Sequence, residues 1–241
     1  MSDRTQGIHD TETRTFPVVE IFGPVLQGEG RMIGVQTLFV RFGYCDFRCT
    51  WCDSLYAVTP DVVQAQAERL NEEEIRERLR ALSAHTPWVT LSGGNPALHD
   101  LGALVAGLHA ERRRVAVETQ GTVFRPWLRE CAVVTVSPKP PSSGMTTNYT
   151  QLGMFAALPT ANLKVVVFDD ADYAYARDIH RRYPAVPFYV QVGNRVGEDD
   201  TAALLAKLDW LSTRALGDAE MADAVVLPQL HVLLYGNRRG V

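Results

Sequence analysis

Cysteine is scarce in this chain. It supplies four of 241 residues, which is too few to build a disulfide-stabilised fold. No apolar run reaches the ~18 residues needed to cross a bilayer, and the start, MSDRTQGIHDTETRTF, has no apolar stretch of the secretory type. An excess of positive charge is also missing, because the formal net charge is −4; no strong basic field would attract a phosphate backbone. We therefore expect a cytoplasmic protein that binds neither nucleic acid nor membranes.

The order of apolar and polar segments predicts one α/β domain. Residues 1–15 are polar and without periodicity, so we predict a disordered leader followed by a single domain over residues 16–241. Apolar runs alternate mostly with segments of helical spacing; the runs are TLFVRFGY, WVTLSGG, RVAVETQ, VVTVSPK, NLKVVVF, PFYVQVG and DAVVLPQ. Near-continuous apolar strands are typical of a parallel sheet covered on both faces. Because a closed barrel needs eight strand–helix units, we predict an incomplete (β/α) barrel of about six parallel strands.

Helical spacing is clearest after Asn71. The Asn71 side chain is placed to cap a helix while Glu74 reaches back to the backbone of the cap. A later helix should start near Glu198 and bury one apolar stripe; its members are Leu204, Leu205, Leu208 and Leu211.

Unusual polar residues follow the predicted strands. In parallel α/β folds, ligands bind outside the carboxyl ends of the strands. Several independent strand ends that meet at one pocket therefore favour a ligand site there. The residues concerned are Cys45, Cys49 and Cys52 after the first run, Ser92 to Pro96 after the second, Glu118 to Gln120 after the third, Ser137 to Lys139 after the fourth, and Gln191 in the sixth.

Cys45, Cys49 and Cys52 have the spacing C-x3-C-x2-C, and we call them the cysteine motif. Structural zinc usually takes four ligands in two pairs, so three thiols without a paired fourth fit zinc poorly. Thiolates are the usual ligands of [4Fe–4S] clusters, and three of them leave one iron open for an outside ligand. Two alternatives stay open. One is a zinc ion whose fourth ligand is a distant histidine, and the other is three core thiols that bind no metal. Cys131, on the approach to a strand, is expected to be buried and structural.

The cysteine motif, with Trp51 before its last cysteine and a later strand that ends in Gly93-Gly94-Asn95-Pro96, resembles the radical S-adenosylmethionine (SAM) enzymes. This resemblance implies that the open iron of a [4Fe–4S] cluster binds SAM. It also implies that one electron then cleaves SAM to a 5′-deoxyadenosyl radical.

Longer stretches carry a narrower resemblance. VVEIFGPVLQGEGRMIGVQTLFVRFGYC, VTLSGGNPAL, VAVETQGT, VSPKPPSSGM and PQLHVLLYGNRRGV resemble the 7-carboxy-7-deazaguanine synthase family over most of residues 16–241. The family implies a lyase that converts 6-carboxy-5,6,7,8-tetrahydropterin to 7-carboxy-7-deazaguanine with loss of ammonia, on the route to queuosine and related 7-deazapurines. It further implies Mg²⁺, a small-molecule pterin substrate, a one-electron donor such as flavodoxin or ferredoxin, and a homodimer.

The resemblance also implies roles for individual residues. Substrate contacts fall to Leu26, Gln27, Gly28, Glu29, Arg41, Ser92 and His231. Cofactor contacts fall to Trp51, Asp53, Gly93, Gly94, Glu118, Ser137, Pro138, Lys139 and Gln191. The cysteine motif holds the cluster, and Ser54 is a magnesium ligand.

The position of Arg41 predicts a role independently of the family. It lies in an apolar strand, where an unpaired charge costs several kcal/mol, so we expect a specific anionic partner for it. For three other residues a plainer interpretation stays open. Glu29 is then a solvated loop charge, His231 a satisfied core histidine, and Ser54 a hydroxyl bonded to local backbone.

Two positions depart from the family pattern. Asn95 stands where glutamate is frequent, and we expect it to cap the following helix. Gln120 stands where asparagine is frequent, and no role is assigned to it.

Two other functions remain open: an activating enzyme that installs a glycyl radical in a partner protein, and a non-enzymatic iron–sulfur carrier.

Overall fold

The structure of the chain is a computed structural model that describes residues 14–197 and 200–241. Most of the predicted leader, residues 1–13, lies outside the described residues. Where the description begins, Arg14 forms an ion pair with Asp100 at 2.5 Å, and Thr15 Oγ1 accepts a hydrogen bond from Arg69 Nε at 3.2 Å.

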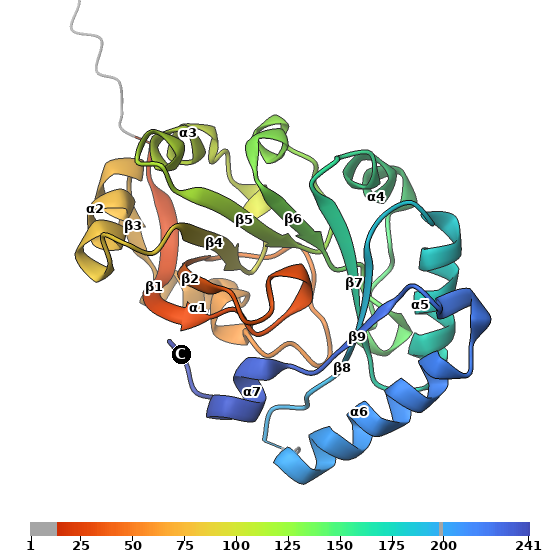
Figure 1. Cartoon of the computed structure of the whole chain (residues 1–241). Helices are drawn as coiled ribbons and strands as arrows, with labels where there is room; N and C mark the ends of the chain where they lie inside the picture. The colour runs from red at the N-terminus through yellow and green to blue at the C-terminus, as the bar shows by residue number, and fades with distance from the viewer. Residues whose placement is uncertain (1–13, 198–199) are drawn as a thin grey trace, which may run out of the picture.

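One sheet runs through the molecule (Figure 1). Its strands are β1 (Phe16–Leu26), β2 (Gln36–Phe42), β3 (Glu68–Leu70), β4 (Trp88–Gly93), β5 (Arg114–Thr119), β6 (Val133–Val136), β7 (Ala161–Val167), β8 (Phe188–Val192) and β9 (Val225–Leu227). Their order is β3-β1-β2-β4-β5-β6-β7-β8-β9. From β2 through β4 to β9 the strands pair in parallel, and each predicted run forms one of them. Since β3 and β9 occupy opposite edges of the sheet, the described chain forms an incomplete (β/α) barrel, as predicted.

β1 and β3 are not among the predicted strands. Both pair antiparallel, β1 with β2 and β3 with β1. The Gly23-Pro24 pair in β1 is typical of a turn rather than a strand, because proline lacks the N–H that a ladder needs. The structure accommodates it at a register shift between Phe22 and Val25, where pairing with β2 is interrupted.

The helices are α1 (Pro60–Gln66), α2 (Glu72–Leu82), α3 (Gly102–Ala110), α4 (Tyr149–Ala156), α5 (Asp170–Arg182), α6 (Thr201–Leu216) and α7 (Leu230–Tyr235). α2 starts as predicted: Asn71 Oδ1 accepts from the Glu74 backbone N–H at 3.0 Å, and Glu74 Oε2 accepts from the Asn71 backbone N–H at 2.8 Å. α6 begins at Thr201 after a cap by Asp200. Its predicted stripe is wrong at Leu205, which is 51% exposed, because it lies about 100° around the helix from the buried Leu204.

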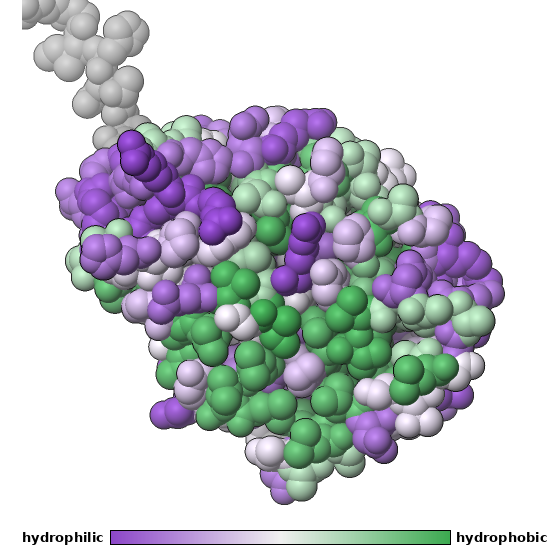
Figure 2. Space-filling view, in the orientation of Figure 1, coloured by the Kyte–Doolittle hydropathy of each residue, from purple (hydrophilic) through white to green (hydrophobic). Residues whose placement is uncertain are grey.

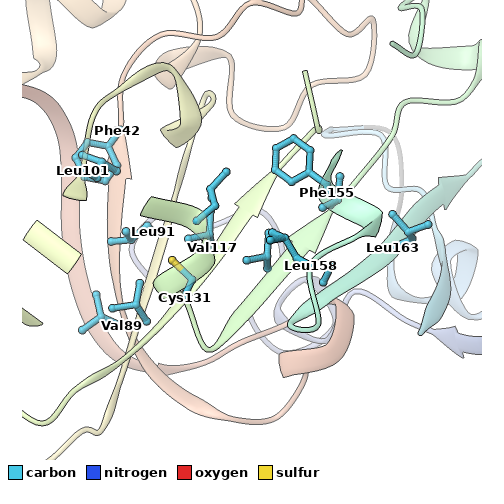
Figure 3. Packing of buried hydrophobic residues seen from close by; sticks show 14 of the residues in the cluster. Phe42, Val89, Leu91, Leu101, Val117, Cys131, Phe155, Leu158 and Leu163 are labelled. Atoms are coloured by element: carbon cyan, nitrogen blue, oxygen red, sulfur yellow. The ribbon is translucent and has the colours of Figure 1, made fainter. Parts of the chain in front are cut away.

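Alternation along the strands separates two environments. In β2, Leu38, Val40 and Phe42 belong to the buried core, whereas Phe39 and Arg41 line a cavity on the opposite face. Figure 3 shows the core, in which the buried Cys131 packs among aliphatic and aromatic side chains; its burial is as predicted. The strands are apolar on the core side as predicted, but the inner face also carries polar residues; they include Thr90, Glu118, Thr135, Lys164 and Gln191.

The surface also divides by hydropathy. Hydrophilic side chains gather over α2, and hydrophobic ones over the lower half of the face that Figure 2 shows, near α7. Among the described residues, no helix combines the length and the apolar character needed to span a bilayer.

Candidate functional site

The carboxyl ends of the central strands open into one cavity of about 210 Å³. Its lining comes from segments as distant in sequence as Leu26 and His231. All residues predicted for the site line this cavity except Pro138 and Gln191. The fold therefore brings the cysteine motif and the predicted substrate residues to a single space.

The three thiols of the cysteine motif are free and partly buried. Burial raises the pKa of each, that of Cys52 to about 11, and the charge of Lys139 partly opposes this effect at Cys49. Thiolates at these positions therefore need a cationic partner such as iron. Among the described residues no three His, Cys, Asp or Glu side chains converge on a point that would hold one metal ion. A cubic cluster does not require such convergence, because each thiolate binds a different iron, so the motif fits a cluster better than zinc.

Hydrogen bonds anchor the loop of the cysteine motif to the segment after β6. The Thr50 backbone N–H donates to Ser143 O at 3.0 Å, and Trp51 Nε1 donates to Ser142 Oγ at 2.9 Å. Ser142 Oγ in turn donates to Asp172 Oδ2 at 2.6 Å, at the start of α5. Asp172 is fully buried, so this chain of bonds connects the loop to the rigid part of the domain.

Gly93 and Gly94 are required by the backbone of β2 and the loop after it. Gly93 has a φ of +130°, and a Cβ on it would lie 2.0 Å from Phe42 O. A Cβ on Gly94 would lie 2.1 Å from Tyr44 O. Both positions therefore need glycine before any ligand is considered. Their contact with a cofactor stays a prediction, and both residues line the cavity.

A buried ionic group, which we call the Lys164 cluster, forms one wall of the cavity. Lys164 Nζ contacts Glu29 Oε2 and lies 3.9 Å from Glu118 Oε1. Gln229 Nε2 donates to Glu29 Oε1 at 2.7 Å, and Gln27 Nε2 donates to Glu118 Oε1 at 3.0 Å. These five residues are the Lys164 cluster. Glu29 is thus a buried, paired carboxylate, not a solvated loop charge.

Charge and burial act in opposite directions in this cluster. Burial raises the pKa of Glu29, but the charges of Lys164 and His231, together with the hydrogen bonds from Lys164 and Gln229, outweigh it and hold that pKa well below its usual range. Burial alone lowers the pKa of Lys164, yet the negative charges of Glu29 and Glu118 raise it above its usual value. Burial raises the pKa of Glu118, which leaves it as the carboxyl group most ready to accept a proton.

Arg41 has the anionic partner that its place in an apolar strand requires. Its Nε donates to Glu20 Oε2 at 3.0 Å, and Glu20 Oε1 also accepts from Arg239 Nε at 2.8 Å. The Nη1 atom of Arg41 lies 3.5 Å from Ser54 Oγ. Ser54 Oγ donates to Asp53 Oδ1 at 2.7 Å, so its partner is a neighbouring carboxylate and not local backbone.

Polar atoms without partners face this region. Among the described residues, Ser92 Oγ, Asn194 Oδ1 and Gln229 Oε1 are buried and make no hydrogen bond, although their residues line the cavity. Gln191, on the inner face of β8, has both amide atoms buried and unpartnered. Because each such group costs roughly 1–3 kcal/mol, these atoms suit a polar ligand such as SAM or a pterin.

The chain's last helix is held against the first cavity loop. The Leu230 backbone N–H donates to Gly28 O at 3.0 Å. A Cβ on Gly28 would lie 2.1 Å from His231 Nδ1, so only glycine leaves room for the imidazole there. His231 lines the cavity and is half-buried, so it does not lie inside the core; its contact with a substrate stays a prediction.

Among the polar residues missing from the prediction are Lys164, Asn194 and Gln229, which line the cavity, and Glu20, which pairs with Arg41. Lys164 interrupts the apolar run NLKVVVF, so the reasoning applied to Arg41 would have found it. Asn194 and Gln229 closely follow β8 and β9, the position that marked other site residues. Glu20 gives no such signal, because its role depends on the register that pairs it with Arg41 across β1 and β2.

Comparison with known proteins assigns the family. A model of the Radical SAM superfamily matches residues 39–136, which include the cysteine motif. The 7-carboxy-7-deazaguanine synthase of Bacillus cereus is 44% identical, with 93% of this chain and 98% of that protein covered. This chain belongs to the 7-carboxy-7-deazaguanine synthase family. The Bacillus subtilis (strain 168) member is 43% identical over the same shares.

Solved structures support the fold of this family member. The crystal structure of QueE from Escherichia coli aligns with a TM-score of 0.68 at 21% identity, and the match covers 90% of this chain and 95% of that one. Membership of the radical SAM superfamily implies a [4Fe–4S] cluster and SAM, and the thiols and unpartnered polar atoms of the cavity fit both.

Proposed function

We propose that this member of the 7-carboxy-7-deazaguanine synthase family is a radical SAM lyase that converts 6-carboxy-5,6,7,8-tetrahydropterin to 7-carboxy-7-deazaguanine with loss of ammonia. One observation carries the proposal: the cysteine motif and the Lys164 cluster line the same cavity. The cysteine motif suits an iron–sulfur cluster for radical chemistry, and the Lys164 cluster suits the binding of a polar heterocycle. The reaction serves queuosine and related 7-deazapurine biosynthesis.

The cofactor half of the cavity would be held by the ends of β2, β4, β5 and β6. The cysteine motif would hold three irons, while Gly93, Gly94, Glu118, Ser137 and Lys139 would contact SAM; Trp51, Asp53, Pro138 and Gln191 complete the proposed set. When bound, the cluster and SAM supply the one-electron chemistry that removes a hydrogen atom from the substrate. Lys139 Nζ lies 5.6 Å from the centre of the Trp51 ring, so its charge is placed beside the cluster loop.

The substrate half of the cavity would recognise the pterin through hydrogen-bond donors and acceptors. A pterin offers an amide-like edge and ring N–H groups. The Glu29 carboxylate, the Gln27 amide and the backbone of Leu26 and Gly28 would pair with that edge, and Ser92 and His231 would add contacts. Arg41 uses Nε for Glu20, and its Nη atoms would take the substrate carboxylate.

Mg²⁺ would sit where Ser54 and Asp53 meet Arg41. Mg²⁺ prefers oxygen ligands and keeps several waters. The Ser54 hydroxyl, supported by the Asp53 carboxylate at 2.7 Å, would supply part of the shell and the substrate carboxylate another part.

We also propose a homodimer that works in the cytoplasm and takes its electron from a flavodoxin or ferredoxin. Large hydrophobic side chains exposed on the described surface support a subunit interface; they include Leu26, Leu216, Val225 and Leu234. Light scattering after size exclusion tests this: a mass near twice 26.7 kDa is expected, and a monomeric mass would reject it.

The decisive assay is anaerobic turnover. The reconstituted protein is incubated with a reductant, SAM and the carboxytetrahydropterin, and 7-carboxy-7-deazaguanine, ammonia and 5′-deoxyadenosine are measured. All three should form. If 5′-deoxyadenosine forms without the deazapurine, the substrate assignment is wrong and a glycyl-radical activating enzyme becomes the better-supported function. An iron–sulfur carrier would form none of the three products.

A further inference from the structure

The two positions that depart from the family pattern meet at one carboxylate. Gln120 Nε2 lies 2.5 Å from Asp46 Oδ1 and 3.4 Å from Cys45 Sγ, and donates to both. Asn95 Nδ2 donates to the same Asp46 Oδ1 at 2.9 Å. Asp46 follows the first cysteine of the motif, so the ends of β4 and β5 both bind the cluster loop at this residue.

The orientation of Asn95 is fixed by its surroundings. It is fully buried. Its Oδ1 accepts from Thr119 Oγ1 at 2.9 Å and from the Ala97 backbone N–H at 3.2 Å, the cap that the sequence predicts. A glutamate at position 95 would bring a second carboxylate against Asp46, and like charges repel. Asparagine at this position therefore gives the Asp46 carboxylate a donor where a glutamate would repel it.

The orientation of Gln120 follows in turn. Its amide end faces two acceptors, Asp46 Oδ1 and Cys45 Sγ, so an amide oxygen in place of the nitrogen would be repelled by the carboxylate. One amide hydrogen therefore points to Asp46 and the other is available to the sulfur. The Phe47 backbone N–H also lies 3.4 Å from Cys45 Sγ, which gives this sulfur two N–H donors.

We propose that Gln120 sets the reduction potential of the cluster by donating an amide N–H to the Cys45 thiolate, and that Asp46 and Asn95 are positioning residues that hold this amide. Reduction adds negative charge to the cluster and its sulfur ligands. Hydrogen bonds to those sulfurs stabilise the reduced state and raise the potential. The inference rests on the proposed function in one respect, namely that the cysteine motif holds the cluster.

The test is a redox titration of the full-length, anaerobically reconstituted protein, followed by electron paramagnetic resonance without SAM, with bound iron and sulfide quantified. In Gln120→Leu the equilibrium constant for one-electron reduction should fall about tenfold, which is about 59 mV. Gln120→Glu has nearly the same shape but turns an acceptor toward Asp46 and the sulfur, so it should lower the potential at least as far.

Gln151→Leu is the matched control. It removes an amide from α4 whose Oε1 accepts from the Phe124 backbone N–H at 3.0 Å, away from the cavity lining, and it should leave the potential unchanged. An unchanged potential in both Gln120 variants at full iron content refutes the inference, as does an equal shift in the control.

Variants that lose the cluster are also decisive. If Gln120→Leu binds fewer than four irons, the reduction potential of Gln120→Glu decides whether the inference holds. If both lose the cluster, Gln120 is needed for assembly and the tuning role is wrong. The cluster assignment is tested separately: a Cys45→Ala variant that keeps a full cluster would overturn the ligand assignment on which the inference rests. If Cys45→Ala loses the cluster while both Gln120 variants keep the wild-type potential, the inference alone is overturned.

Discussion

Replacing Lys164 with methionine should lower the free energy of unfolding at pH 7 by about 3–5 kcal/mol, because it removes one partner of a buried ion pair. The Lys164 side chain is 5% exposed and that of Glu29 is 14% exposed. Methionine fills a similar volume but leaves Glu29 and Glu118, whose side chains are 14% and 26% exposed, without the cation that contacts them. The loss should exceed that of a surface ion pair, which is about 0–1 kcal/mol.

The pH dependence gives this prediction a sign. In the wild type the pKa of Glu29 is lowered below its ordinary value of 4.5, so its contribution to stability is present above about pH 4.5 and is lost as the pH falls further. Without Lys164, burial loses its main opponent, so the folded-state pKa of Glu29 should rise above its unfolded value and that of Glu118, already raised by burial, should rise further. Ionising them then destabilises the folded state, and this penalty disappears as the pH falls. The difference in stability between variant and wild type should therefore be smaller at pH 5 than at pH 8.

Urea unfolding, followed by circular dichroism at both pH values with matched cluster content, measures the effect. The double variant Lys164→Met with Glu29→Gln should recover part of the loss, because it removes one uncompensated charge. If the free energy of unfolding falls by less than about 1 kcal/mol, or by the same amount at pH 5 and pH 8, the reasoning is refuted. Water would then screen the charges of the Lys164 cluster so well that they hardly interact.

Three further predictions concern the ligands. Alanine at any position of the cysteine motif should abolish the iron absorbance, whereas Cys131→Ala should keep it; loss in the Cys131 variant would overturn the ligand assignment. Arg41→Lys should weaken substrate binding by roughly 1–3 kcal/mol and leave SAM binding nearly unchanged by calorimetry; an equal loss for both ligands would indicate a folding defect. Ser54→Ala should blunt the increase of initial rate with Mg²⁺ in chelator-treated buffer while Ser54→Thr retains it, and an undiminished response in the alanine variant would place the metal elsewhere.

Local chemistry explains which parts of the fold are predictable from sequence. The parallel strands are apolar runs bounded by breakers, and the capping box at Asn71 involves atoms only three residues apart. β1 and β3 escape prediction because their pairing is antiparallel and non-local. The Gly23-Pro24 pair also has the composition of a turn, and only its position at an interruption of the β2 ladder makes it compatible with a strand.

The site divides in the same way. Strand-end positions marked the part of the cavity lining that follows β2, β4, β5 and β6, because in parallel folds the chain itself directs those residues to one edge. Partners that depend on tertiary register, such as Glu20 opposite Arg41, leave no trace in the local pattern. Lys164 is an intermediate case: its charge within an apolar run signals a partner, but only the structure identifies Glu29, which lies 135 residues away.

The Lys164 cluster also joins distant segments of the chain into one wall of the cavity. It joins the loop after β1 through Gln27 and Glu29, β5 through Glu118, β7 through Lys164 and the start of the last helix through Gln229. Each of these polar groups would be costly to bury alone, and in the cluster each has a partner of opposite charge or a hydrogen bond. The lysine that breaks an apolar run is therefore the cation that compensates two carboxylates from different segments, which is why its removal should cost more than the loss of a surface ion pair.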